Sequence, residues 1–381
     1  DIFAYTDSRS GIAVGQPVRH ASENELFTRA IAVWTPNDAH SLAFGTEYSH
    51  TWFKDPPQSD ALDRLPIVED RTWETNTISF LVEEQWKIND QLTLFLSFRT
   101  DKNDFSDWLI SPRGTLVYTP TNEDTFKVMV GQSVRRGDDE ELYGEYERSG
   151  TIPEPETLRS YELSYDRKLS SDWNVGVRGF YEDYDAIGWI PSLYQSASLG
   201  QFQIAGGEIE LTYSTRSTRI TLSESVSTLV DASVPEGAAP AGQGLSSSPY
   251  GYGGELANWA PSITKLALIH DLSRQWTISS SVILYSGFPG GQDYSEYAAS
   301  LATTPQAVPL SDAGYDTPYG PNLYVNFGLE YRPTEHCTIR LDGYNLAALV
   351  DDSLSKRNYI LRTSEYSDEP AAVAISVSYS F

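Results

Sequence analysis

The sequence predicts an all-β fold: a transmembrane, antiparallel, up-and-down β-barrel with about 15–16 strands present. Three observations predict it. Segments that alternate apolar and polar residues recur along the 381-residue chain, short polar turns alternate with long loops, and no apolar run approaches the length of a membrane helix. A helix needs roughly 18 such residues, whereas an alternating strand presents a lipid-facing surface without raising the local mean hydropathy.

The last eleven residues have the pattern most clearly, reading AAVAISVSYSF. Successive side chains of a strand point to opposite faces, so this segment has one apolar face and one face of small residues. About 9–11 residues of this kind cross a bilayer as a tilted strand. We therefore predict a membrane-assembly strand whose apolar face consists of Val373, Ile375, Val377, Tyr379 and Phe381.

Seven hairpins precede this strand. Each joins two alternating segments through a short turn rich in Pro, Asn, Asp or Ser, residues that favour tight turns through their backbone chemistry. Residues 1–6 have the character of part of a further strand. The predicted pairs are 26–35 with 41–53, 77–87 with 92–105, 108–118 with 125–135, 158–169 with 173–187, 202–214 with 218–230, 261–270 with 276–287, and 323–331 with 338–346.

The connections between hairpins are long, except for one near Ser106. This alternation places all the short turns at one end of the sheet, as in outer-membrane barrels with short periplasmic turns and long extracellular loops. A β-sandwich has no reason to sort its loops in this way. The long loops are predicted at 54–71, 136–157, 188–200, 231–259, 288–321 and 347–370.

The two faces of most strands also differ in polarity. One face is apolar and the other carries charged or amide residues at strand centres, which indicates a lipid-facing exterior and a polar interior. Two exceptions are Glu84, which lies on the apolar face of its strand, and residues 266–269, which are apolar on both faces.

Charge and motif content narrow the function. The net charge of −26 excludes nucleic acid as a partner, because phosphate binding needs a basic surface. Cys337 is the single cysteine, so the chain forms no internal disulfide. The five histidines lack zinc-ligand spacing and no G-x-S-x-G segment is present. We predict no catalytic residues, no enzyme activity and no cofactor.

Several segments resemble a known family. Residues 155–164 read PETLRSYELS, similar to the P-E-x-x-x-x-Y-E-L-G segment of TonB-dependent outer-membrane transporters. Residues 133–136 (SVRR), followed by Glu-Leu at 141–142, resemble S-x-x-F-R-x-P-x-x-x-E-L, with its Phe and Pro replaced. Asn-Leu at 345–346 lies where the family has N-L-F-D, and the next two residues depart from F-D. The resemblance covers about 26–381.

The resemblance implies a 22-stranded barrel with an N-terminal plug and a short energy-coupling box. We find neither plug nor box here, so we expect residues 1–381 to be a partial outer-membrane β-barrel domain; a smaller complete barrel is the alternative. The implied function is active transport across the cell outer membrane. Extracellular loops would capture a scarce solute, such as an iron–siderophore or corrinoid, and a TonB-type protein would supply the energy through the plug.

Two other interpretations stay open at this point. One is a self-contained porin-like channel or structural barrel without energy coupling, and the other is a soluble β-rich binding module. Expected partners are outer-membrane lipid and lipopolysaccharide, the TonB-type protein and a small-molecule ligand.

Candidate site residues lie in the loops. Tyr and Trp offer large contact areas that suit either an interfacial girdle or a ligand site. The acidic run at 138–141 has the oxygen ligands that Ca²⁺ prefers, but a solvated loop is the simpler interpretation, so it is a weak metal candidate. The ligand-binding candidates are Arg135, Arg136, Tyr143, Tyr146, Trp189, Tyr252, Trp259, Tyr294 and Tyr315; the weak metal candidates are Asp138, Asp139, Glu140 and Glu141.

Overall fold

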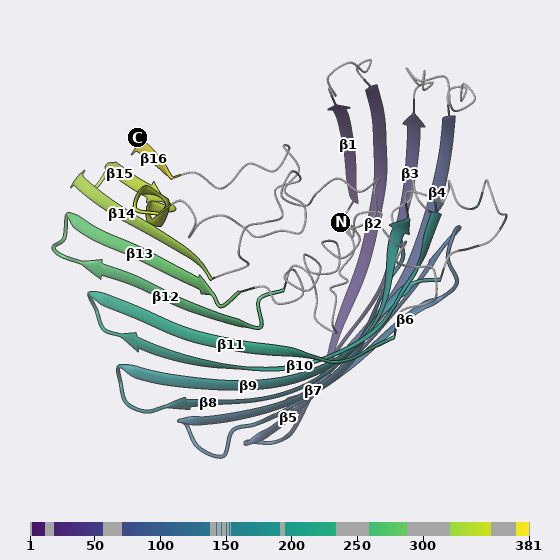
Figure 1. Cartoon of the computed structure of the whole chain (residues 1–381). Helices are drawn as coiled ribbons and strands as arrows, with labels where there is room; N and C mark the ends of the chain where they lie inside the picture. The colour runs from purple at the N-terminus through teal and green to yellow at the C-terminus, as the bar shows by residue number, and fades with distance from the viewer. Residues whose placement is uncertain are drawn as a thin grey trace, which may run out of the picture. The chain divides into compact units, whose positions relative to one another are not determined.

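The computed structural model contains one sheet of sixteen strands in which each strand is hydrogen-bonded to its neighbours in sequence (Figure 1). β1 and β16 stand at the two ends of this order and have one neighbour each. The structure describes residues 2–11, 19–55, 71–137, 154–190, 195–233, 259–287, 321–351 and 371–380, together with 142, 146, 150 and 152. The predicted all-β, up-and-down topology is confirmed.

The strand bounds follow the predicted hairpins. They are β1 (Ile2–Gly11), β2 (Arg19–Asn37), β3 (His40–Asp55), β4 (Arg71–Asn89), β5 (Leu92–Asn103), β6 (Leu109–Tyr118), β7 (Asp124–Arg135), β8 (Glu156–Lys168), β9 (Trp173–Ile190), β10 (Gln195–Ser214), β11 (Thr218–Ser233), β12 (Ser262–Asp271), β13 (Trp276–Tyr285), β14 (Asn322–Thr334), β15 (Cys337–Tyr344) and β16 (Ala372–Tyr379), with one 3-10 helix, η2 (Leu346–Leu349).

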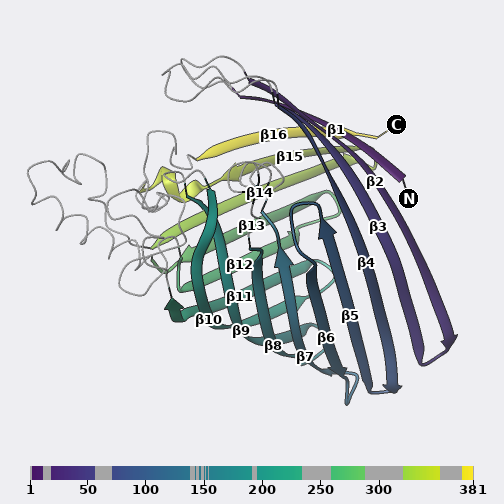
Figure 2. The same ribbon diagram turned by 90° about the vertical axis from the view of Figure 1, so that its right-hand side faces the viewer.

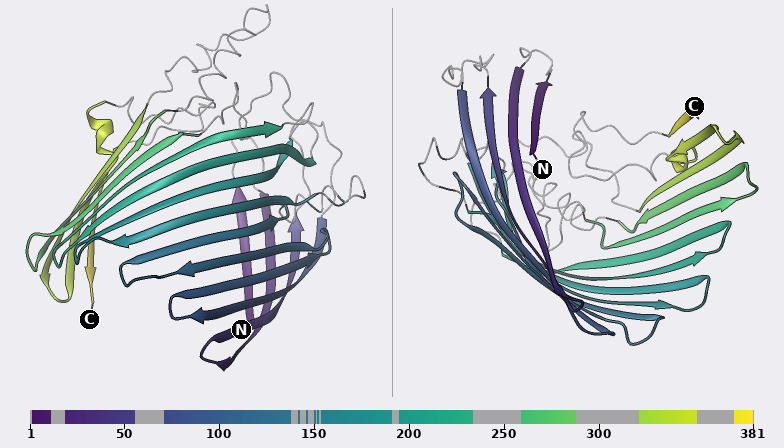
Figure 3. Two further views of the ribbon diagram at one scale, coloured as in Figure 1. Left: turned by 90° about the horizontal axis from the view of Figure 1, so that it is seen from below. Right: turned by 180° about the vertical axis from the view of Figure 1, so that it is seen from behind.

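The chain divides into two compact units. The first comprises Asp1–Val117, Met129–Arg159 and Asp185–Ser198, and contains β1 to β5. The second comprises Tyr118–Val128, Ser160–Tyr184 and Leu199–Phe381, and contains β11 to β16. The long neighbouring strands β2 to β4 can be followed in Figure 2, and the shorter strands at the yellow end of the chain in Figure 3.

One predicted loop is wrong. β9 continues to Ile190 and β10 begins at Gln195, so most of the loop expected at 188–200 is strand. The Gly and Tyr content of this segment suggested a loop, but strand preference depends on the partner strand, which the sequence does not display. In the same way β2 begins at Arg19 rather than 26, and β4 at Arg71 rather than 77.

Aromatic pairs collect at the short-turn ends of the strands. In the second unit Trp276 stacks on Tyr331 with ring centroids 4.3 Å apart, and Phe126 stacks on Tyr165 at 4.6 Å. In the first unit Trp86 stacks on His40. Aromatic side chains favour the boundary between hydrocarbon and water, so these pairs mark the membrane boundary on the short-turn side.

The strand register keeps the apolar residues on one face, which we call the outer face; the polar face is the inner face. In the first unit Phe44, Val82 and Phe98 lie in one row across β3, β4 and β5. In the second unit Tyr331, Ile339 and Val377 form a comparable row, and Val377 is 68% exposed. Such exposure of apolar side chains is expected where lipid is the solvent.

No helix in the described part of the chain has the length and apolar character needed to cross a membrane.

Two of the carboxylates on the outer face have polar partners on neighbouring strands. Glu84, the exception noted in the sequence, accepts a hydrogen bond from His40 beside the β2–β3 turn, with 2.7 Å between Nδ1 and Oε1. Glu224 on β11 accepts hydrogen bonds from the hydroxyls of Ser262 and Thr264 on β12. Acidic groups on this face are thus accommodated by local donors, which reduces the cost of placing them near lipid.

The Asn-Leu segment noted in the sequence fixes the end of the β14–β15 hairpin. Asn345 adopts a left-handed conformation with φ 51°, and its backbone N–H donates to Oδ1 of Asn326 on β14 at 2.8 Å. Leu346 then begins η2 and packs against Gly343, where a Cβ would come within 2.9 Å of Leu346 Cδ2. This segment has a structural role: it turns the chain at the end of β15.

Candidate ligand-binding surface

The inner face of β3, β4 and β5 carries an aromatic cluster at the end away from the short turns. Phe53 on β3 stands opposite Trp73 on β4, and their rings stack with centroids 3.8 Å apart. Trp73 meets the ring of Phe105 edge-on at 6.4 Å. Tyr146, from the connection between β7 and β8, lies 5.4 Å from Phe105. These four residues form one continuous aromatic surface within the first unit.

A polar layer lies next to this aromatic cluster on the same face. The Asn103 side chain is 1% exposed and donates to Oγ1 of Thr75 at 2.8 Å and of Thr77 at 2.7 Å. The Asn103 Oδ1 accepts a hydrogen bond from the backbone N–H of Phe105 at 2.9 Å, and the backbone N–H of Asn103 donates to Ser106 Oγ. Asn103 therefore fixes the tight turn after β5 and, through it, the position of the Phe105 ring.

An ion-pair network follows towards the short turns. Glu47 on β3, 5% exposed, accepts contacts from Arg29 Nε at 2.6 Å and Arg99 Nη1 at 2.8 Å. Arg99 also contacts Asp101 at 2.7 Å, and Asp101 accepts the hydroxyl of Ser79 at 2.5 Å. Two cations balance two carboxylates, and charge-assisted hydrogen bonds of this kind hold side chains in fixed positions. This part of the wall is a preorganised, charge-balanced surface.

Arg113 on β6 is different from these arginines. Its side chain lies flat over Gly131 of β7, with Cγ 3.5 Å from where a Cβ of Gly131 would be. It is exposed, and among the described residues no hydrogen bond or ion pair engages it. A solvent-accessible guanidinium with open donors can receive an anionic group.

The structure places three of the predicted ligand residues in defined contacts. Tyr146 joins the aromatic cluster described above. Arg135, the last residue of β7, contacts Glu156 at 2.7 Å, so its charge is balanced within the first unit. Trp259 Nε1 donates to Ser227 Oγ at 2.6 Å, which fixes the ring beside β11 in the second unit.

The other predicted site residues are less defined. Arg136 follows β7 directly, and Trp189 lies on β9 rather than in the predicted loop. Within the described ranges no three His, Cys, Asp or Glu side chains form a group that could hold a metal ion. The remaining candidates lie outside the described residues: Tyr143, Tyr252, Tyr294, Tyr315, Asp138, Asp139, Glu140 and Glu141, as does Phe381 of the terminal strand.

Sequence analysis missed Phe53, Trp73, Phe105 and Arg113. The predicted candidates lay in loops or at a strand end, whereas Phe53, Phe105 and Arg113 fall within predicted membrane strands and Trp73 lies just before one. A signal was available: Phe53, Trp73 and Phe105 all have the parity of the polar face, where a large aromatic side chain is unexpected.

Comparisons with known proteins agree with this architecture. A family model described as TonB dependent receptor-like, beta-barrel matches residues 3–346. The ferric enterobactin receptor PfeA of Pseudomonas aeruginosa (a mutant) is similar with a TM-score of 0.66 and 13% identity, over 96% of this chain and 55% of that chain. The siderophore receptor PirA of Acinetobacter baumannii has a TM-score of 0.65 and 15% identity, over 96% and 55%.

A third similar structure is the copper transporter OprC, with a TM-score of 0.66 and 12% identity over 96% of this chain and 57% of that chain. The chain thus spans little more than half the length of these solved chains. A comparison with curated proteins gave no match. At such identities the solved structures establish the fold, and the family match over most of the chain establishes membership. The chain belongs to the TonB-dependent receptor β-barrel family of the outer membrane.

Proposed function

We propose that this chain is the barrel part of an outer-membrane active transporter that captures a scarce solute at its extracellular side and passes it to the periplasm. The observation that carries the proposal is the aromatic cluster of Phe53, Trp73, Phe105 and Tyr146 on the inner face. Rigid aromatic rings give a large contact area at low entropic cost, which suits capture of a bulky, partly apolar ligand.

The solute class we infer is a metal chelate or corrinoid. The structurally similar proteins are named as receptors for ferric enterobactin and other siderophores and as a copper transporter, which supports this class. Arg113 would receive an anionic group of such a chelate, and the predicted loop residues, among them Arg135, Arg136 and Trp259, would complete the site. Energy would come from a TonB-type protein acting through a plug.

Replacement of Trp73 by Ala tests the capture site. The intact protein would be titrated with a panel of ferric siderophores, a copper chelate and cobalamin, with binding followed by tryptophan fluorescence. We expect the affinity for the bound compound to fall about 5- to 150-fold, since an aromatic contact contributes about 1–3 kcal/mol. Trp276→Ala is the matched control, because Trp276 stacks on Tyr331 at the short-turn end.

Unchanged affinity in Trp73→Ala would remove the cluster from the site. Energy coupling is tested separately by measuring uptake of the bound compound in cells with and without a functional TonB protein. Uptake that continues without TonB would favour the porin-like channel.

A further inference from the structure

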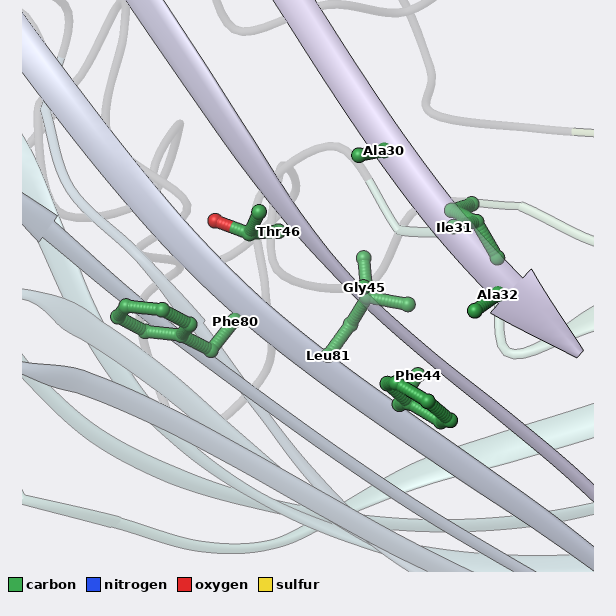
Figure 4. A pocket seen from close by; sticks show the side chains of 8 residues that line it. All are labelled: Ala30, Ile31, Ala32, Phe44, Gly45, Thr46, Phe80 and Leu81. Atoms are coloured by element: carbon green, nitrogen blue, oxygen red, sulfur yellow. The ribbon is translucent and has the colours of Figure 1, made fainter.

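The outer face of β2, β3 and β4 contains an apolar hollow of about 540 Å³ (Figure 4). Ala30 and Ala32 on β2 and Thr46 on β3 supply small side chains, and the rings of Phe44 and Phe80 stand beside them. The strand register places these five side chains on the outer face, and Ile31, Gly45 and Leu81 complete the lining.

Gly45 lies where β2 comes close to β3. Its missing side chain would lie on the inner face, where a Cβ would come within 2.5 Å of the Ala30 carbonyl oxygen and 3.0 Å of the Ile31 side chain. Glycine thus lets β2 and β3 approach closely beneath the hollow, while small side chains on the outer face leave the space above it empty.

A polar network begins at the next outward-facing position of β3, on the side of the hollow that lies away from the short turns. Asn76 Oδ1 accepts the Tyr48 hydroxyl at 2.7 Å and lies 2.8 Å from His50 Nδ1. The Asn76 amide donates to Asp104 Oδ2 at 2.9 Å. Trp52 meets the His50 ring edge-on at 4.1 Å. All of these side chains belong to the first unit, and Tyr48 and Trp52 are 41% and 42% exposed.

The spacing of the two features fits within one leaflet. Thr46 in the hollow and His50 in the network are four residues apart on β3, about 13 Å along the strand at a rise of roughly 3.3 Å per residue. Because transmembrane strands tilt by about 35–45°, this is about 10 Å along the membrane normal, within the roughly 15 Å of half the hydrocarbon core. An acyl chain that starts at the network would therefore reach the hollow within the same leaflet. Because the network lies away from the short periplasmic turns, that chain belongs to the outer leaflet.

We propose that this surface is a binding site for one glycolipid of the outer leaflet, of the lipopolysaccharide class. Its acyl chain fills the hollow, and its sugar head contacts the polar network. The composition of the network favours a sugar over a bare phosphate. Amide, carboxylate, imidazole and phenol groups can both donate to and accept from hydroxyls, and Trp52 offers a flat apolar surface for a sugar ring. The acids Glu74, 3.6 Å from His50, and Asp104 disfavour an unscreened phosphate.

The test measures glycolipid that copurifies with the intact protein, extracted from outer membranes in mild detergent and examined by native mass spectrometry. Ala30→Phe fills the hollow and should retain about tenfold less glycolipid, because the acyl chain loses its buried contacts. Trp52→Ala, which leaves the hollow intact, should also reduce retention. Val282→Phe is the control: it also places a phenyl ring on the outer face, but on β13, and should retain the glycolipid.

Heat-modifiable gel mobility reports whether each variant is folded. If Ala30→Phe does not fold, Ala32→Phe blocks the same hollow from the next outward position of β2. Equal retention by the hollow-filling variants and Val282→Phe would overturn the site. Retention of phospholipid in place of glycolipid, abolished by the same variants, would overturn the proposed head group.

Discussion

Strands β2, β3 and β4 of the first unit are far longer than most strands near the C-terminus. β2, β3 and β4 have 19, 16 and 19 residues, whereas β12, β13, β15 and β16 have 10, 10, 8 and 8. A tilted strand crosses a bilayer with about 9–11 residues. The C-terminal strands are therefore membrane spans and little else, while the first unit continues its sheet beyond the membrane.

The additional strand length carries the candidate site. Phe53 lies in the last part of β3, and Trp73 and Thr75 lie in the first part of β4, all beyond the residues that a membrane crossing needs. A surface built on hydrogen-bonded strands holds its side chains more precisely than a loop does. The difference teaches that ligand recognition in this chain is to be sought on extended strands as well as in loops.

The largest effect is expected where a strand only spans the membrane. Val377→Arg on β16 places a charge on the outer face and should cost about 2–4 kcal/mol of folding free energy if it lies near the midplane. The control is Ala374→Arg on the inner face of the same strand, directly opposite Asp342. Urea titrations in lipid vesicles measure both variants. Equal losses would contradict the assignment of the two faces.

A smaller effect should separate the inner-face ion pairs of the two regions. Glu47→Gln removes a carboxylate that two arginines contact at 2.6 and 2.8 Å. Glu330→Gln removes a carboxylate that lies 2.5 Å from Arg332 and 3.9 Å from Arg340. Charge-assisted hydrogen bonds contribute about 1.5–3 kcal/mol each where they are well formed.

We expect Glu47→Gln to cost more, because both of its contacts are short and the carboxylate is better shielded, with side-chain exposures of 6% for Glu47 and 18% for Glu330. The measurement is again the urea midpoint in vesicles, with unchanged slope as the check on two-state unfolding. A larger loss for Glu330→Gln would show that the first unit owes no particular rigidity to its ion-pair network.

The comparison also separates what the sequence could predict from what it could not. Alternation and turn residues located the seven predicted hairpins, because both are local properties of the chain. Strand ends beyond the membrane were missed, since residues such as Trp73 pair only with a distant segment. The ion pair between Glu47 and Arg99 likewise depends on strand register, which fixes contacts between residues far apart in sequence.

The candidate site was predicted less well for the same reason. Tyr146 was identified by composition, but its partner Phe105 was assigned to the membrane-spanning strand and overlooked. Arg113 differs from Arg99 only in what surrounds it. No local pattern distinguishes an arginine held by two carboxylates from one that lies open over a glycine.

The smallest effect concerns the turns that close the hairpins. In the first unit Asn37 Oδ1 accepts the backbone N–H groups of Ala39 at 2.9 Å and His40 at 3.1 Å. In the second unit the Ser273 hydroxyl accepts those of Gln275 at 3.1 Å and Trp276 at 3.2 Å. Both side chains replace a backbone acceptor in a tight turn, which is why Asn and Ser are frequent there.

Replacing either residue by Ala leaves two backbone donors to water, because the turns are exposed. Each loss should be about 0.5–1.5 kcal/mol, the net value of a typical hydrogen bond. The loss for Asn37→Ala should lie at the upper end of this range. Its hydrogen bonds are shorter, and its turn joins two long strands, β2 and β3, of sixteen or more residues each. Refolding rates into vesicles, measured beside the urea midpoints, test this. If Ser273→Ala slows refolding more than Asn37→Ala, then turn closure matters most where strands are short, and the length of β2 and β3 compensates for a weaker turn.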